Sequence, residues 1–208
     1  MTPDRVESAS KEMLPMYGMV LSGDTPSLIA DLRSIENDLR YAARLFERVA
    51  HTSSDGEPDL RRALYDAGAI AYRRGFTSGR SLVTKGRSRS KVPDDILDSL
   101  DPEVRRAHEA VLERANTHIA HRVSEAEQGR VLLLLNNPSL GQAIQGIGYF
   151  SARFVGPSVE DALRDVEVAQ LLADSVAAFV QIVQGELIEA AKDRDLGSLY
   201  DSATPMGD

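Results

Sequence analysis

Apolar residues recur at spacings of three and four along four stretches of the chain, which predicts four main helices. The first is expected from Thr25–Pro26 to about Ala50, and one side of it carries Leu28, Leu32, Ile35, Leu39, Ala42, Phe46 and Val49. The second is expected to be capped by Asp55 and to end near Arg74–Gly75, and one side of it carries Leu60, Leu64, Ala67 and Ile70. A short helical turn is expected over Pro93–Leu100.

The other two helices begin at recognisable capping signals. Asp101–Pro102 supplies an N-cap and a first helical residue for a central helix over Val104–Glu125. Ser158, with Asp161 three residues later, resembles a capping box for the last helix, which is expected to run to about Lys192. The apolar seam of that helix consists of Ala162, Val166, Ala169, Ala173, Val176, Val180, Val183 and Leu187.

Between these two helices the pattern changes to that of strands. Val131–Leu135 is a short apolar run that ends at the turn signal Asn136–Asn137–Pro138, and Gly146–Val155 alternates loosely. We expect two antiparallel strands whose buried side carries Ile147, Tyr149 and Phe154. The alternative, that Val131–Leu135 extends a buried helix, is disfavoured by Gly129. The predicted fold class is therefore mainly α, an antiparallel helical bundle with a small β-hairpin before the last long helix.

A chain of 208 residues is long enough for one domain with a sizeable core, which we assign to residues 23–195. Residues 1–22 lack a sustained period and are expected to form a flexible arm whose methionines could pack on a partner. Residues 196–208 are polar, contain a proline and two glycines, and are expected to be a disordered tail.

Composition narrows the class of protein. A hydrophobic content of 42% with 27% charged residues is typical of soluble globular proteins. The absence of cysteine excludes disulfides, thiolate metal sites and cysteine nucleophiles. No stretch approaches the length of a membrane span, and acidic residues precede the mildly apolar Met13–Leu21, where a signal peptide would be basic. We therefore expect a cytoplasmic protein that does not enter a membrane.

The net charge of −8 conceals a basic stretch. Between Ala67 and Pro93 there is no acidic residue but seven basic ones: Arg73, Arg74, Arg80, Lys85, Arg87, Arg89 and Lys91. Such a patch on an acidic protein indicates a local anionic partner, although a solvated loop would have the same composition. A nucleotide triphosphatase is excluded, because Thr84 and Gly86 replace two required residues of the phosphate-binding loop and no apolar strand precedes it.

The central helix concentrates groups that transfer protons and bind anions. At 100° per residue, Arg114, His118, His121 and Glu125 fall in one strip about 60° wide. A separate apolar strip on the same helix consists of Val104, Val111, Ala115 and Ile119. Two histidines and a glutamate on one short segment match no metal-site motif, so we expect neither a metal nor another cofactor.

These residues resemble a known family. Arg114-x6-His121 fits the R-x(4–6)-H signature of the HEPN superfamily, and the run HIAH at 118–121 is similar to that of uncharacterised bacterial HEPN-like proteins, which carry R-[DN]-K-H-I-A-H. Their upstream helix carries AY-x-R-x-F-x-x-G-R, which Ala71–Arg80 matches here. The resemblance spans roughly Leu28 to Glu189, with the arginine one residue earlier than in that group and followed by Ala115.

The resemblance implies a HEPN-like helical homodimer that acts as a metal-independent endoribonuclease in toxin–antitoxin or antiviral defence, held in check by an inhibitory protein partner. In this hypothesis His121 is the acid/base and Arg114 stabilises the charge of the transition state. His118 and Asn116 position the RNA, and the basic stretch Arg73–Lys91 follows its backbone.

Two alternatives from other classes stay open. The first is a non-catalytic HEPN-like dimer that binds RNA, a nucleotide or a protein partner, which the shifted arginine and the overall acidity favour. The second is an architectural helical protein in which the strip of Arg114, His118 and His121 is a dimer seam.

Overall fold

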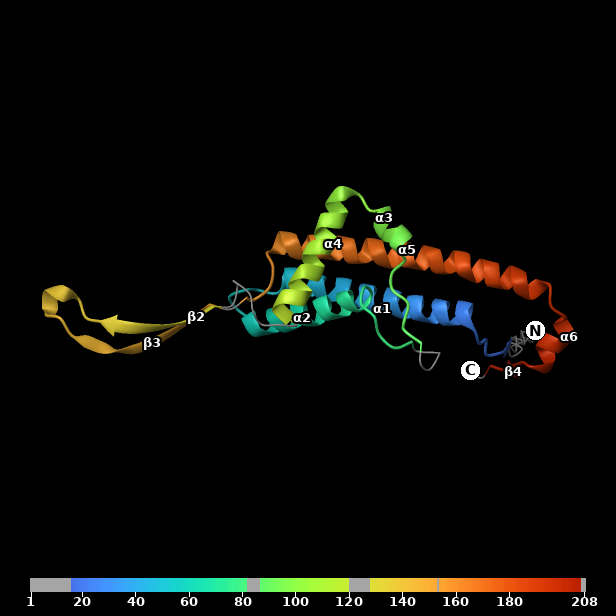
Figure 1. Cartoon of the computed structure of the whole chain (residues 1–208), viewed down its shortest axis with the longest axis horizontal. Helices are drawn as coiled ribbons and strands as arrows, with labels where there is room; N and C mark the ends of the chain where they lie inside the picture. Colours follow the sequence, from blue (N-terminus) through green and yellow to red (C-terminus); the bar gives the residue numbers. More distant parts are fainter. Residues whose placement is uncertain (1–15, 82–86, 120–127, 153, 207–208) are drawn as a thin grey trace, which may run out of the picture.

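Three long helices lie roughly side by side and form the body of the molecule (Figure 1). They are α1 (Asp24–His51), α2 (Pro58–Arg74) and α5 (Val159–Lys192). The computed structural model describes residues 16–81, 87–119, 128–152 and 154–206, mainly as helices with two small antiparallel sheets. This confirms the predicted mainly-α class with a small hairpin, and α1 and α5 follow their predicted bounds closely.

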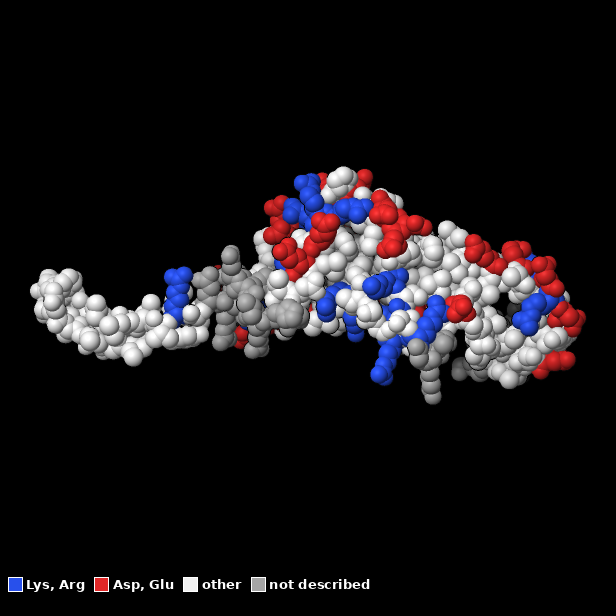
Figure 2. Space-filling model, viewed as in Figure 1, with Lys and Arg blue, Asp and Glu red and all other residues white. Residues whose placement is uncertain are grey.

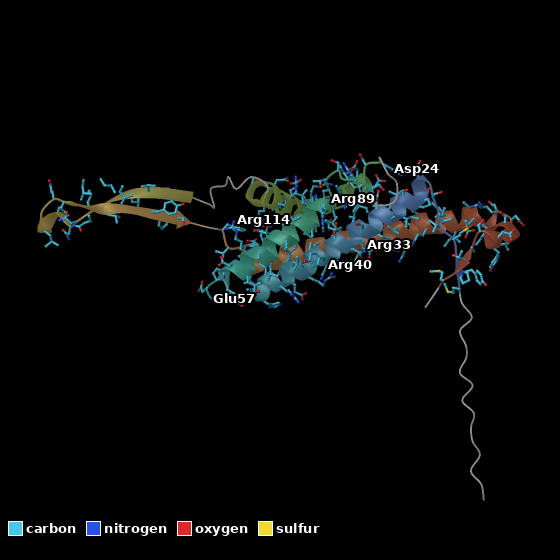
Figure 3. The ribbon with its side chains drawn as sticks, turned by 90° about the horizontal axis from the view of Figure 1, so that it is seen from below. Asp24, Arg33, Arg40, Glu57, Arg89 and Arg114 are labelled. Atoms are coloured by element: carbon cyan, nitrogen blue, oxygen red, sulfur yellow. The ribbon has the colours of Figure 1, made fainter. Side chains whose placement is uncertain are left out.

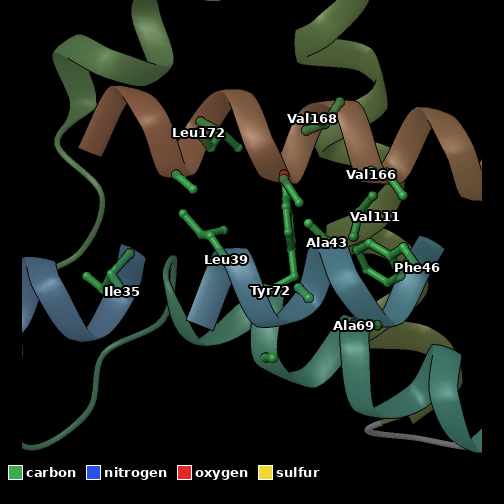
Figure 4. Close-up of a cluster of buried hydrophobic side chains, with 14 of the residues drawn as sticks. Ile35, Leu39, Ala43, Phe46, Ala69, Tyr72, Val111, Val166, Val168 and Leu172 are labelled. Atoms are coloured by element: carbon green, nitrogen blue, oxygen red, sulfur yellow. The ribbon is translucent and has the colours of Figure 1, made fainter. Parts of the chain in front are cut away.

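The core lies between α1 and α5, with α2 closing one side (Figure 4). The predicted apolar face of α1 is buried, and Leu32, Ile35, Leu39 and Phe46 are fully enclosed. From α5, Leu172 and the small residues of the predicted seam pack against them. Each fully buried leucine, isoleucine or phenylalanine stabilises the fold by roughly 1.5–3 kcal/mol, so this apolar seam is the main source of stability.

The predicted apolar side of α2 is confirmed only in part. Leu64 packs against the core, but Leu60 and Ile70 are nearly half exposed. Tyr65, Ala69 and Tyr72 are the buried residues of this helix instead. The tyrosine rings supply the large apolar surface, and Gly68 lets α2 approach α1 closely, so the helix is rotated away from its aliphatic positions. The predicted cap is also wrong, because Glu57 stands at the N-cap position.

Two buried polar side chains hold loops onto the body. Arg61 of α2 donates to the carbonyl oxygens of Val49, Thr52 and Pro157, and thereby joins the end of α1 to the segment that leads into α5. Asp31 of α1 accepts hydrogen bonds from the Ser81 hydroxyl at 3.1 Å and the Ser90 amide at 3.0 Å. The second set of contacts therefore fastens the basic stretch to the face of α1 at two points, Ser81 and Ser90.

The predicted central helix is interrupted. After α3 (Asp94–Asp98), α4 (Pro102–Arg114) crosses the body and is followed by a π-helical turn over Ala115–Ile119. A continuous α-helix over Val104–Glu125 is therefore wrong at Ala115–Ile119. Residues 120–127, which include the rest of that prediction, lie outside the described part of the chain.

The predicted hairpin is present, but its sides are exposed. β2 (Gln128–Leu135) and β3 (Ile144–Ala152) pair antiparallel, and a 3₁₀ turn over Pro138–Leu140 closes the tip. Ile147 and Tyr149, predicted to be buried, are 75% and 73% exposed, because the hairpin extends away from the helices (Figure 1). Phe154, beyond the hairpin, does pack against the core.

The last helix begins where its capping signal predicts, since the Ser158 hydroxyl accepts a hydrogen bond from the Asp161 amide. Among the described helices, α5 alone is long and apolar enough to cross a membrane, contrary to the expectation that no stretch is. Length and composition alone are weak grounds for a span, because a core helix meets the same criteria, and α5 supplies ten buried residues of this fold.

The predicted disorder of the tail is wrong for residues 196–206. α6 (Leu196–Asp201) begins with the Asp195 carboxylate accepting from the Ser198 amide. β4 (Thr204–Pro205) then pairs with β1 (Tyr17–Gly18), so both ends of the described chain meet at the end of the molecule opposite the hairpin (Figure 1).

Candidate active site

Arg114 is the last residue of α4 and lies at the end of that helix nearest the hairpin (Figure 3). Its Nη2 donates to Oδ1 of Asp165 on α5 at 2.6 Å. The Arg114 side chain is 22% exposed and that of Asp165 is 2% exposed, so the pair lies at the boundary between core and solvent. The guanidinium also lies over the ring of Tyr65, 5.9 Å from its centroid.

Three buried polar atoms at this place have no hydrogen-bond partner among the described residues: Nε of Arg114, Oδ2 of Asp165 and the hydroxyl of Tyr65. Burial raises the pKa of the Asp165 carboxyl to about 7, and the positive charge of Arg114 acts in the opposite direction. Near neutral pH the protonated and the ionised form of this carboxyl are therefore both populated. Perturbed carboxyls beside an arginine in a cleft are typical of functional sites.

The pair opens into a pocket of about 290 Å³ between α4 and α5. Arg106, Arg114 and Arg164 line it together with Glu103, Asp161 and Asp165. Arg164 is already paired with Glu160 and Asp161, whereas Arg106 forms no ion pair with any described residue. The pocket therefore offers guanidinium donors to a small anion such as one phosphate group.

Arg73 and Asn116, two of the predicted site residues, are in direct contact. Nε of Arg73, on α2, donates to Oδ1 of Asn116, in the π-helical turn, at 2.6 Å. Arg73 forms no ion pair with a described residue, so its charge stays available to an anion. A second cationic group is thus placed beside the turn that follows Arg114.

The π-helical turn changes the geometry expected for the motif. A π-turn holds more residues than the 3.6 of an α-helix, so the strip calculated at 100° per residue does not continue past Arg114. His118 belongs to this turn, but its side chain lies outside the described structure, as do His121 and Glu125 entirely. Single π-helical turns occur frequently at functional sites.

The third histidine of the segment, His108, is part of the core. Its Nδ1 shares a hydrogen bond of 2.7 Å with the Tyr72 hydroxyl, and its ring lies edge-on to Phe76. Burial lowers the pKa of the His108 imidazole, which therefore stays neutral at physiological pH. This histidine supports the packing of α4 on α2.

Three of the seven basic residues of the basic stretch are paired with carboxylates of α1. Arg74 and Arg89 pair with Asp38 at 2.6 and 3.7 Å, and Arg87 pairs with Asp24 at 2.9 Å. Figure 3 shows Arg89 and Arg114 at different places along the body. Arg80 and Lys91 form no ion pair with a described residue, and Lys85 lies outside the described part of the chain. Of the six predicted nucleic-acid contacts that lie in the described part of the chain, Arg73 is the one that forms a hydrogen bond with the motif segment.

Asp165 is the site residue that the sequence analysis missed. It stands between Ala162 and Val166 in the predicted seam of the last helix, where a carboxylate is out of place. A charged residue within an apolar seam is the feature of the sequence from which this site residue could have been predicted. Within the described residues, no group of three or more histidine and acidic side chains is arranged to hold a metal.

No family model matches the chain, and neither a curated protein nor a solved structure matches it. The resemblance to the HEPN superfamily therefore rests on the sequence motifs alone and stays a prediction.

Proposed function

We propose that the protein is a HEPN-type, metal-independent endoribonuclease that acts as a homodimer in a toxin–antitoxin or antiviral defence system. The observation that carries the proposal is the position of Arg114. This arginine of the R-x6-H motif lines a pocket together with two further arginines and three acidic residues, directly before the π-helical turn that bears Asn116 and His118. Arg73, held by Asn116, adds a second cation beside that turn.

The residues suit the chemistry of RNA cleavage by transesterification. The 2′-oxygen loses its proton to a base and attacks phosphorus, the bond to the 5′-oxygen breaks, and that oxygen leaves with a proton from an acid. The products are a 2′,3′-cyclic phosphate and a 5′-hydroxyl. In our proposal His121 transfers these protons, and Arg114 stabilises the negative charge on the phosphorane oxygens.

The carboxyl of Asp165 orients the arginine. It engages one terminal nitrogen of Arg114, which leaves the other terminal nitrogen, Nη1, as a donor for a phosphate. His118 and Asn116 position the RNA, and Arg73 contacts an adjacent phosphate.

The non-catalytic alternative is favoured by a specific observation. The charge of Arg114 is compensated by Asp165, and Arg74, Arg87 and Arg89 are occupied by carboxylates of α1. In this reading the same surface binds RNA, a nucleotide or a protein partner without cutting, and the protein is an interaction module.

Cleavage of mixed RNA substrates in EDTA separates these functions. Wild type is expected to cut, and His121→Ala is expected to reduce the rate by about 10²–10⁴-fold because the proton-transfer group is lost. Arg114→Ala is expected to reduce it by about 10²–10³-fold because charge on the phosphorane is no longer stabilised. Cut ends are identified as 2′,3′-cyclic phosphates by mass spectrometry.

Matched controls are the exposed His51 and Arg48 of α1, whose alanine variants should cut RNA at the wild-type rate. Folding of every variant is checked by circular dichroism. If folded wild type binds RNA at low salt but never cuts it, the protein is a binding module and not a ribonuclease. Cutting that survives both His121→Ala and Arg114→Ala would remove this site from the mechanism.

A further inference from the structure

The hairpin formed by β2 and β3, Gln128–Ala152, is an apolar arm that extends from the helical body (Figure 1). Directly paired residues share a face of a two-stranded sheet. One face of the arm consists of the pairs Val131 with Tyr149, Leu133 with Ile147, and Leu135 with Ile144. All six side chains are 59–75% exposed. We call these six residues the arm face.

The opposite face is apolar as well, but flatter. Leu132 and Leu134 stand opposite Gly148 and Gly146, which have no side chains. Leu134 lies over Gly148, where an added Cβ would meet its methyl groups at 3.3 Å. The leucines thus cover the neighbouring strand and are 45% exposed, less than any member of the arm face. The arm face is therefore the side that leaves more apolar surface in water.

Such an arm needs a partner for physical reasons. An isolated two-stranded hairpin is at best marginally stable in water. At roughly 120 Å² for each side chain, the arm face exposes about 700 Å² of apolar surface, close to the ~800 Å² per partner of a specific interface. Contiguous exposed apolar patches of this size mark interaction sites.

The chemistry of the arm disfavours a lipid surface. Arg130 is the only charged residue between Gln128 and Ala152, and the arm is uncharged along almost its whole length (Figure 2). A basic cluster that would attract anionic headgroups is missing from these residues, and the chain carries a net charge of −8. The outer edges of both strands also present backbone groups that hydrocarbon cannot satisfy.

We propose that the arm is a dimerisation element whose face packs against the same face of a second copy of this chain. A flat, uncharged, apolar surface is its own complement, so a twofold axis joins two arms without any other partner. Packed about 10 Å apart, as the layers of a β-sandwich are, the two faces bury each other's side chains. The area available is that of a stable dimer.

Sedimentation equilibrium of the full chain tests this proposal. Wild type is expected to be a dimer at micromolar concentration. Leu133→Lys and Ile147→Lys are each expected to raise the dimer dissociation constant about 30-fold or more, because a charge is placed at the centre of the interface. Leu140→Lys at the tip and Ile182→Lys on α5 change similarly exposed residues outside the arm face and should leave the dimer intact.

A second measurement uses the absence of native cysteine. Ile147→Cys should be joined into covalent dimers by a short bismaleimide, whereas Ile182→Cys should stay monomeric on a denaturing gel. A wild type that is monomeric at the highest soluble concentration, or a dimer that survives both lysine substitutions on the arm face, would overturn the proposal. The proposal would also be overturned by a monomeric wild type that sediments with phosphatidylcholine vesicles when Leu133→Lys does not.

The oligomeric state is measured without RNA, so this inference and the ribonuclease proposal can fail separately. A monomeric wild type that cleaves RNA in EDTA removes the dimerisation arm and the homodimer named in the proposed function, and leaves the ribonuclease chemistry. A dimer held by the arm face that cuts no RNA removes the chemistry and leaves the arm.

Discussion

A single carboxyl, that of Asp165, controls the electrostatics of the candidate site. It is placed among apolar residues of α5 and meets Arg114, with one oxygen engaged and the other unpaired among the described residues. Burial outweighs the attraction of the arginine and raises the pKa of this carboxyl to about 7. The protonation of the pair therefore changes near neutral pH. The stability of the fold should change with it.

The pH dependence of stability follows in sign from this pKa. An unfolded Asp165 ionises near pH 4, whereas the folded one keeps its proton to about pH 7, so its contribution to stability falls as pH rises between these values. From pH 5 to pH 8 the free energy of unfolding of wild type should fall by roughly 2–3 kcal/mol relative to Asp165→Asn. Urea unfolding at both pH values measures the difference.

The control for this measurement is Asp174→Asn, on the same helix, whose side chain is 68% exposed. That variant should keep the pH dependence of wild type. If the stability of Asp165→Asn relative to wild type rises or stays level as the pH falls from 8 to 5, the carboxyl is ionised throughout the range.

At the scale of elements, the close approach of α1 and α2 depends on a glycine. A Cβ built on Gly68 would lie 2.8 Å from Cε1 of Phe46, whose ring is enclosed by Tyr65 and Tyr72. The ring has no free space into which it could turn. The packing of α2, rather than its aliphatic pattern, therefore sets which side of that helix is buried.

Gly68→Ala should destabilise the protein by about 1–2 kcal/mol, because the strain of overpacking exceeds the gain in helix propensity. Gly185→Ala, in α5, is the matched substitution, since an added Cβ there meets nothing within 4 Å. It should stabilise the protein by about 0.5–1 kcal/mol. Chemical denaturation measures the free energy of unfolding of both variants. Equal changes of the same sign in this free energy would contradict the packing argument.

At the scale of the whole molecule, the helical body and the arm differ in what stabilises them. The body has its own core between α1, α2 and α5, whereas every apolar side chain that the arm face presents is exposed. The hairpin adds little to the stability of the body, and its surface is left for association.

Removal of the arm should therefore leave the body folded. A chain in which residues 128–152 are replaced by a Gly-Ser linker should keep its helical circular dichroism. Its urea midpoint should equal that of Leu133→Lys. Both proteins are expected to be monomeric, so the comparison is free of the stability that dimerisation adds. A truncated chain that is unfolded, or clearly less stable than Leu133→Lys, would mean that the hairpin belongs to the fold of the body.

Much of the secondary structure could be predicted from the sequence, because helix caps and periodicity are local. The Ser158 cap and the bounds of α1 and α5 are such cases. Which side of α2 faces the core could not, since the tyrosine rings and Gly68 act through contacts with α1. The order found in residues 196–206 was missed because β4 pairs with β1, nearly the whole length of the chain away.

For the candidate site, the sequence by itself determined the motif: Arg114, the histidines after it and a basic stretch upstream. Only the tertiary structure decided which charges meet. It pairs Arg114 with Asp165 of α5, brings Arg73 to Asn116, and occupies Arg74, Arg87 and Arg89 with carboxylates of α1. The physical reason is that charge–charge contacts and burial depend on distances between elements remote in sequence, whereas caps and periodicity depend on neighbours along the chain.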